Sequence, residues 1–187
     1  DPLDLFVDLV GGLNPSIIDE TTDFPNNAVT VSPATLAAIV GNVTLYASCD
    51  MRLNSAIALA GAGQGLAANA GRDLQMGAGI TTNGGALSLS AGRTLNVFNG
   101  SALSTAGGSV TLGAQSFVNG SLISIAAGTG NVSASTSAGA LQLGTISSAG
   151  TVNLSASGGN LGLSNITSTG AVTLSGSSQV SANAIAT

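Results

Sequence analysis

Apolar and polar residues alternate in short runs along most of this chain. The clearest run is the segment 86–97, with the sequence Ala-Leu-Ser-Leu-Ser-Ala-Gly-Arg-Thr-Leu-Asn-Val. Successive side chains of a strand point to opposite faces, so the leucines and the valine lie on one side and the serines and the asparagine on the other. The Ala-Gly step at 91–92 interrupts the alternation. The segment therefore predicts two short strands that meet at a bend.

The same pattern recurs every 20 to 23 residues from position 43 onward. The apolar residues that open the repeats are Val43, Leu66, Leu87, Val110, Val132, Val152 and Val172. A second apolar column consists of Met51, Leu74, Leu95, Phe117, Leu141, Leu161 and Val180. A third consists of Ile57, Ile80, Leu103, Ile125 (or Ile123), Ile146, Ile166 and Ile185. The alternative at Ile123 stays open, because the segment 121–127 fits either the first or the third strand of a coil.

A period of this length is typical of a solenoid, whose coils are each too small to bury their own apolar face. Three apolar columns predict three short strands per coil, each paired in parallel with the strands above and below it. Connections between parallel strands are nearly always right-handed. We therefore predict an all-β fold, a right-handed parallel β-helix (β-solenoid) of roughly seven coils.

Residues 1–27 lack the repeat, and residues 28–187 form the predicted β-helix domain. The first segment carries six of the eight acids, and we interpret it as a cap, a linker or an association segment. The apolar residues that would make its contacts are Leu3, Leu5, Phe6, Val7, Leu9 and Val10. They would cover the chain's own first coil, near Val29 and Val31, or the last coil of a neighbouring copy, near Val180 and Ile185.

One short helix is expected before the first regular coil. Ser32 and Pro33 precede the apolar segment 34–40, and Gly41 follows it. Serine is a preferred helix cap, and proline is favoured at the first helical position. This helix would form a corner between a strand at 28–31 and the repeats.

Charged residues make up only 6% of the chain, against about 25% in average proteins. The net charge is −5 and there is no basic patch, which excludes nucleic acid as a partner, because its phosphates require arginines and lysines. No apolar run approaches the ~18 residues of a spanning helix, so we predict no transmembrane segment. The chain begins without Met, and we expect it to be a processed or excised piece of a longer protein.

Candidate chemistry is sparse. The chain has no histidine, which excludes a Ser-His-Asp triad. Asp50 and Asp73 share one column, and adjacent coils lie about 4.8 Å apart, so the two carboxylates would approach the spacing found in retaining glycosidases. We favour the alternative that each aspartate pairs with a neighbouring arginine, and that Cys49 is a corner residue without a catalytic partner. The prediction is a protein that is not an enzyme and has no catalytic residues, metal or cofactor.

Outward-facing polar residues form a column of their own. Its members are Thr44, Ser88, Thr111, Ser133, Asn153 and Thr173. A regular face of hydroxyl and amide groups suits the binding of ice or of a carbohydrate. The alternative is that such residues simply suit exposed strand positions.

Two features resemble a known family: the segment 31–48, Val-Ser-Pro-Ala-Thr-Leu-Ala-Ala-Ile-Val-Gly-Asn-Val-Thr-Leu-Tyr-Ala-Ser, and the Ala-Gly-Arg-Asp/Thr-Leu bends at 70–74 and 91–95. They are similar to the repeats of filamentous-haemagglutinin-like adhesins, the exoproteins of bacterial two-partner secretion. The resemblance covers residues 28–187. It implies a right-handed parallel β-helix, export across the outer membrane and a fibrous adhesive or structural role.

These observations favour a structural or adhesive extracellular shaft of a bacterial surface adhesin or filament. Its expected partners are further copies, stacked end to end, and a glycan of a host or environmental surface. The alternative is a carbohydrate- or ice-binding solenoid, and a third candidate is a polysaccharide-degrading β-helix enzyme.

Overall fold

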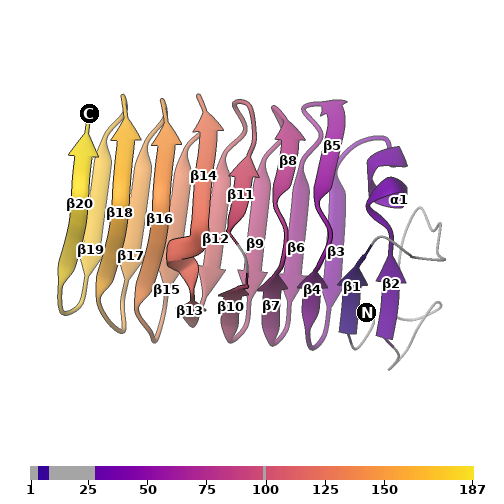
Figure 1. Ribbon diagram of the computed structural model, residues 1–187, viewed down its shortest axis with the longest axis horizontal. Helices are drawn as coiled ribbons and strands as arrows, with labels where there is room; N and C mark the ends of the chain where they lie inside the picture. The colour runs from indigo at the N-terminus through magenta and orange to yellow at the C-terminus, as the bar shows by residue number, and fades with distance from the viewer. Residues whose placement is uncertain (1–3, 9–27, 99) are drawn as a thin grey trace.

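The computed structural model of the chain describes residues 4–8, 28–98 and 100–187, and it consists of stacked coils of β-structure. The coils stand side by side along the long axis, from the N-terminal end at the right of Figure 1 to the C-terminus at the left. The chain rises on the near side, crosses at the top and descends on the far side while it advances, so the helix is right-handed (Figure 1). The predicted parallel β-helix is confirmed.

Three parallel sheets run along the axis. Sheet A contains, in spatial order, β2 (Ala28–Val31), β1 (Asp4–Val7), β4 (Met51–Leu53), β7 (Asp73–Met76), β10 (Thr94–Val97) and β13 (Ser116–Val118). Sheet B contains β3 (Val43–Ala47), β6 (Leu66–Ala70), β9 (Leu87–Ala91), β12 (Val110–Ala114), β15 (Val132–Thr136), β17 (Val152–Ala156) and β19 (Val172–Gly176). Sheet C contains β5 (Ile57–Ala62), β8 (Ile80–Asn83), β11 (Ser101–Ser104), β14 (Ile123–Gly128), β16 (Leu141–Ser148), β18 (Leu161–Ser168) and β20 (Val180–Ala186).

Seven coils run from β3 to β20, because sheets B and C each contain seven strands. Strands β1 and β2 extend sheet A beyond the first coil, which brings the stack to about eight turns. The strand registers reproduce the first and third columns inferred from the sequence. The second column divides, because Met51 to Phe117 pair within sheet A, whereas Leu141, Leu161 and Val180 pair within sheet C. In the third column, the open alternative resolves to Ile125, which pairs with Leu103 and Ile146, whereas Ile123 pairs with Ser101.

The last three coils differ from the prediction of three strands per coil. In each of them, the second and third strands merge into one continuous strand: β16, β18 or β20. These coils repeat every 20 residues, two or three fewer than most of the coils before them, so they have no corner loop at this position. In β16 the alternation of buried and exposed residues slips at Leu143 and Gly144, which are both buried, and the strand continues.

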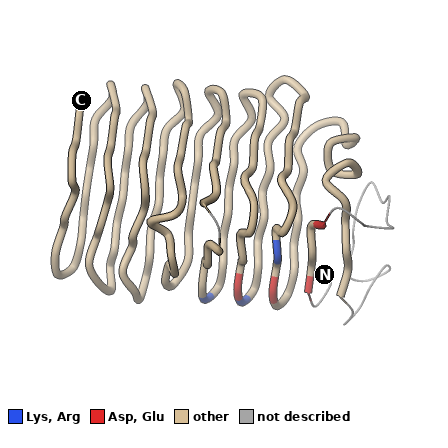
Figure 2. Tube along the Cα trace, in the orientation of Figure 1, with Lys and Arg blue, Asp and Glu red and all other residues tan. Residues whose placement is uncertain are grey.

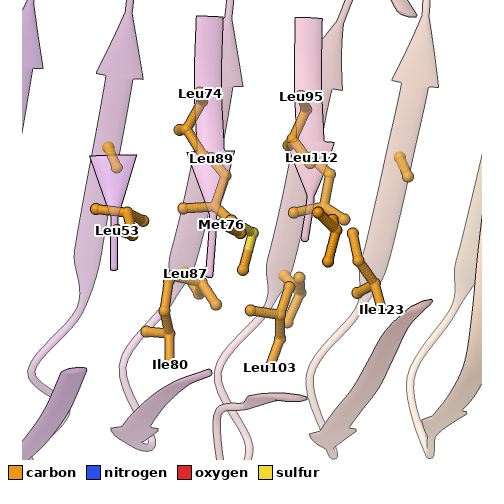
Figure 3. Packing of buried hydrophobic residues seen from close by; sticks show 14 of the residues in the cluster. Leu53, Leu74, Met76, Ile80, Leu87, Leu89, Leu95, Leu103, Leu112 and Ile123 are labelled. Atoms are coloured by element: carbon orange, nitrogen blue, oxygen red, sulfur yellow. The ribbon is translucent and has the colours of Figure 1, made fainter. Parts of the chain in front are cut away.

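Aliphatic side chains fill the interior from one end of the stack to the other. Figure 3 shows the middle of this core, where Leu89 and Leu112 of sheet B lie next to Leu74 and Leu95 of sheet A. Each of these four side chains is at most 1% exposed. Every coil thus contributes to one shared core, as expected for coils that cannot bury their apolar faces alone.

The corner between sheets C and B contains buried hydroxyl groups, which the sequence analysis did not single out. The hydroxyl of Thr82 donates to the carbonyl of Gly85 at 2.6 Å, and Thr105 bonds to Gly108 in the same way in the next coil. A Cβ at Gly85 would lie 2.0 Å from the carbonyl oxygen of Gln64, which only glycine can avoid. The corner therefore combines a close approach of backbones with a buried hydrogen bond that satisfies the turn carbonyl.

The helix α1 (Pro33–Ala38) packs against β5 at the N-terminal end of the stack (Figure 1). Ser32 caps it, since its Oγ accepts a hydrogen bond from the Thr35 amide at 3.2 Å. Leu36 is buried, and the Gln64 side chain donates to the Ile39 carbonyl at 2.7 Å. The predicted short helix is confirmed, with its end two residues earlier than expected. Among the described residues, no helix is long and apolar enough to cross a membrane.

Candidate functional site

The charged corner lies between sheets B and A in the first three coils (Figure 2). Arg72 donates from Nε and Nη2 to the two carboxylate oxygens of Asp50, both at 2.7 Å. One coil later, Arg93 forms the same two-pronged bond to Asp73, with Nε 2.8 Å from Oδ1. The predicted pairing of each aspartate with a neighbouring arginine is confirmed, and each arginine reaches back to the aspartate of the preceding coil.

Both aspartates are ionised at neutral pH. The hydrogen bonds from Arg72 hold the pKa of Asp50 below its ordinary value, and those from Arg93 do the same for Asp73. A glycosidase requires one carboxylic acid that keeps its proton until it transfers it to the leaving group. In both carboxylates the hydrogen bonds from the paired arginine outweigh the effect of burial, so neither pKa is raised as that role requires. The arrangement neutralises charge and ties adjacent coils together.

A third aspartate belongs to the same column. Asp4 lies beside Asp50 because β1 pairs with β4, and its Oδ1 accepts a hydrogen bond from the Asp50 amide at 3.0 Å. Asp50 accepts likewise from the Asp73 amide at 3.3 Å. The sequence analysis missed this placement. The signal was the match of Asp-Leu-Phe-Val at 4–7 to Asp-Met-Arg-Leu at 50–53 and Asp-Leu-Gln-Met at 73–76.

The candidate association segment is partly built into the chain's own sheet. Leu5 and Val7 are buried in the core, and they pair with Val29 and Val31 of β2. Phe6 points outward, with the Arg52 guanidinium 5.4 Å from the centre of its ring. For residues 4–8 the structure thus has the own-chain arrangement. The other members of the predicted segment, Leu3, Leu9 and Val10, lie outside the described residues.

The predicted polar column lies on the outer face of sheet B in one continuous register. Its members Thr44, Ser88, Thr111, Ser133, Asn153 and Thr173 occupy equivalent positions in successive coils. Ala67 takes this position in the second coil and interrupts the row of polar groups. Most of these side chains are exposed, so the face presents a row of uncharged hydroxyl and amide groups, one in each coil except the second.

A shallow groove crosses the outer face of sheet C, which the sequence analysis did not single out. It has a volume of about 380 Å³ and extends over β11, β14, β16 and β18. Its outward-facing lining consists of Ala102, Ser104, Ser124, Ala126, Thr145, Ser147, Asn165 and Thr167. Because these side chains are small and uncharged, the groove offers hydroxyl and amide groups to a neutral ligand.

An exposed apolar cluster lies at the corner between sheets A and C in the third and fourth coils. Phe98 is 54% exposed, and Val118 and Leu122 are exposed to a similar degree. Leu122 belongs to the short 3₁₀ helix η1 (Gly120–Leu122), which precedes β14. Leu122 lies in the segment 121–127, for which the sequence left two assignments of strand open.

The charges are confined to one half of the chain. The three arginines, Arg52, Arg72 and Arg93, lie in the first three coils, and residues 94–187 contain no charged side chain at all. Figure 2 shows the same division along the axis. Cys49 is half-buried, and its backbone carbonyl accepts a hydrogen bond from the Arg72 amide of the next coil. Within the described residues, no group of three or more His, Cys, Asp or Glu side chains is placed to hold a metal ion.

A comparison of the chain with protein-family models, with curated proteins and with solved structures finds no match. Inference about function therefore starts from the geometry of this chain: its continuous core, its neutral outer faces and the ion-paired corner of its first coils.

Proposed function

We propose that this chain is a structural shaft, an extracellular β-helical segment of a bacterial surface adhesin or filament. The observation that carries the proposal is the aliphatic core, which continues without interruption through seven coils of parallel strands. Interstrand hydrogen bonds run along the axis, and every coil is packed on both sides except at the ends. Such a stack resists bending and stretching, which is the property that a shaft requires. The resemblance to haemagglutinin-like repeats supports the extracellular and adhesive part of the proposal.

A distance measurement tests the rigidity. Spin labels at Thr44 and Thr173 in a Cys49→Ser background would be six coil steps apart, which is about 29 Å at about 4.8 Å per step before the label linkers are added. We expect a single narrow distance distribution by pulsed electron paramagnetic resonance. The pair Thr44 and Ser133, four steps apart, is the matched control and should give a peak about 10 Å shorter. A broad distribution for the longer pair beside a narrow one for the control would contradict a rigid shaft.

A second candidate function is the binding of a neutral glycan in the groove of sheet C. The observation that favours it is the uncharged hydroxyl and amide lining of that groove. Calorimetric titration with neutral polysaccharides tests it. Ser124→Arg should abolish binding because Ser124 lines the groove, whereas the matched change Ser133→Arg on sheet B should have no effect. Equal loss in both variants, or no heat with the unchanged protein, would exclude the groove as a glycan site.

Binding of ice is the weaker alternative. A lattice match needs the same group at every coil, and Ala67 together with the mixture of Ser, Asn and Thr breaks this regularity. A thermal hysteresis measurement separates this alternative from the shaft, which predicts none.

A further inference from the structure

Strand β1 occupies a gap between two strands of its own sheet. The chain runs from β2 through α1 and β3 to β4, yet β2 and β4 are not neighbours in sheet A. The spatial order is β4, β1, β2, so one strand position between β2 and β4 is filled by residues 4–7 (Figure 1). The two walls of this position come from the segment 28–53, and its occupant comes from an earlier part of the sequence. We call this position the β2–β4 slot.

The slot holds its occupant by backbone hydrogen bonds on both sides. On the β4 side, the Leu5 amide donates to the Asp50 carbonyl and the Asn54 amide donates to the Val7 carbonyl, each at 2.9 Å. On the β2 side, the Asp8 amide donates to the Val31 carbonyl at 3.2 Å. An occupying strand thus completes the ladder of two edges that would otherwise expose unpaired groups.

Side chains give the slot its specificity. The two inward residues, Leu5 and Val7, are 1% and 0% exposed, so they fill interior volume of the first coil. The outward residue Phe6 lies under the Arg52 guanidinium, and Asp4 accepts from the Asp50 amide. The slot therefore recognises four residues in this order: an acidic residue, an apolar residue, an aromatic residue and a second apolar residue.

The connection between the two strands is much longer than the path that it has to cover. Strands β1 and β2 are parallel, with Asp4 opposite Ala28, so the chain must return by about one strand length, roughly 13 Å. Residues 9–27 supply 19 residues, which can reach up to about 60 Å when extended. The covalent connection therefore does not confine β1 to the slot of its own copy.

We propose that the β2–β4 slot is a strand-binding site whose second occupant is β1 of another copy of this chain. The same hydrogen bonds, buried leucine and valine and cation–π contact form in either arrangement, so the exchange costs little beyond the loss of covalent tethering. Reciprocal exchange joins two copies, and sequential exchange joins many. The inference does not rest on the proposed shaft function, although it supplies a way to link shafts.

A connection of this length corresponds to an effective concentration on the order of millimolar, which sets the condition for exchange. Protein refolded at about 1 mM should form linked copies, whereas protein refolded at about 1 μM should fill its own slot.

A cysteine pair records which copy occupies the slot. Phe6→Cys with Arg52→Cys, in a Cys49→Ser background, places the two thiols at directly paired positions of β1 and β4. Paired residues on neighbouring strands lie about 4.8 Å apart, within the Cα separation that a disulfide accepts. After oxidative refolding at about 1 mM, we expect covalent dimers and higher multiples on non-reducing electrophoresis, and single chains after refolding at about 1 μM.

The matched control is Arg52→Cys with Gln75→Cys in the same background. These positions pair between β4 and β7, which short connections hold in one coil stack. This disulfide should remain within one chain at both concentrations. Single chains for the Phe6 pair at both concentrations would overturn the proposal, as would multiples in the control that match those of the Phe6 pair.

A second measurement uses the unsubstituted chain, in case the cysteine variants fold poorly. Light scattering after size-exclusion chromatography should give multiples of 17.8 kDa for material refolded at about 1 mM and the single-chain mass for material refolded at about 1 μM. A single-chain mass at both concentrations would refute the exchange.

Discussion

Truncation of one core leucine tests both the register and the energetics of the stack. Leu89 of β9 is 1% exposed and points inward between Ala68 of the preceding coil and Leu112 of the following one. Because Ala68 is already small, the change Leu89→Ala would place two alanines in succession in this column. The surrounding backbone is fixed by hydrogen bonds to both neighbouring coils, so the cavity cannot collapse fully. We expect a loss in the upper part of the usual range for buried leucines, about 3–5 kcal/mol.

The loss can be measured by urea unfolding followed by far-ultraviolet circular dichroism. A domain of this size has a total stability of about 5–15 kcal/mol, so the change removes a large fraction and lowers the melting temperature by roughly 10 °C. Ser88→Ala is the matched control on the outer face of the same strand, and it should change stability by less than about 0.5 kcal/mol. Equal effects at positions 88 and 89 would refute the inward and outward assignment and the argument built on it.

Three further predictions follow from the corners and the overall architecture. Gly85→Ala should lower the melting temperature strongly, because its Cβ would lie 2.0 Å from the Gln64 carbonyl oxygen, whereas Gly113→Ala meets no atom within 4 Å and should be mild; equal shifts would contradict the close approach. Arg93 lowers the pKa of Asp73, so this carboxylate stabilises the fold above its ordinary pKa of 3.8 and ceases to do so as the pH falls through the lowered value. Asp73→Asn should therefore be less stable than the unchanged protein at pH 7, with the difference vanishing as the pH falls below the lowered pKa of Asp73. A difference that is independent of pH in thermal melts would argue against the ion pair. Circular dichroism should show mainly β-structure. A helical content above about a quarter would approach the roughly one third of average globular proteins and would exclude the fold.

The repeat made most of the fold predictable. In a β-helix, residues of the same column are stacked at a fixed spacing, so the sequence interval between equivalent apolar residues directly gives the pairing register. Val110 and Val132 were assigned to one column on this basis, and they are paired in the structure. The same logic placed Asp50 next to Asp73 and each aspartate within reach of an arginine.

Features outside the repeat were not predictable in this way. Strand β1 has one four-residue match to the pattern, and the 20 residues 8–27 separate it from the next strand, so no interval revealed its place in sheet A. The inward hydroxyls of Thr82 and Thr105 look like surface residues by type. Their burial follows from the turn carbonyls of Gly85 and Gly108, whose need for a donor becomes evident only in three dimensions.

The two ends of the stack differ in how well their apolar side chains are covered. At the first coil, β1, β2 and α1 cover the interior, and the charged residues Asp4 and Arg52 belong to β1 and β4, close to the edge strand β2. At the last coil, Val180 and Ile185 continue the inner columns but are 44% and 46% exposed. Natural sheets usually protect such edges with charges or bulges, and residues 94–187 carry no charged side chain. A further coil or another molecule that packs on this end would therefore have to supply apolar side chains that continue these columns, and it would meet no charged side chain there.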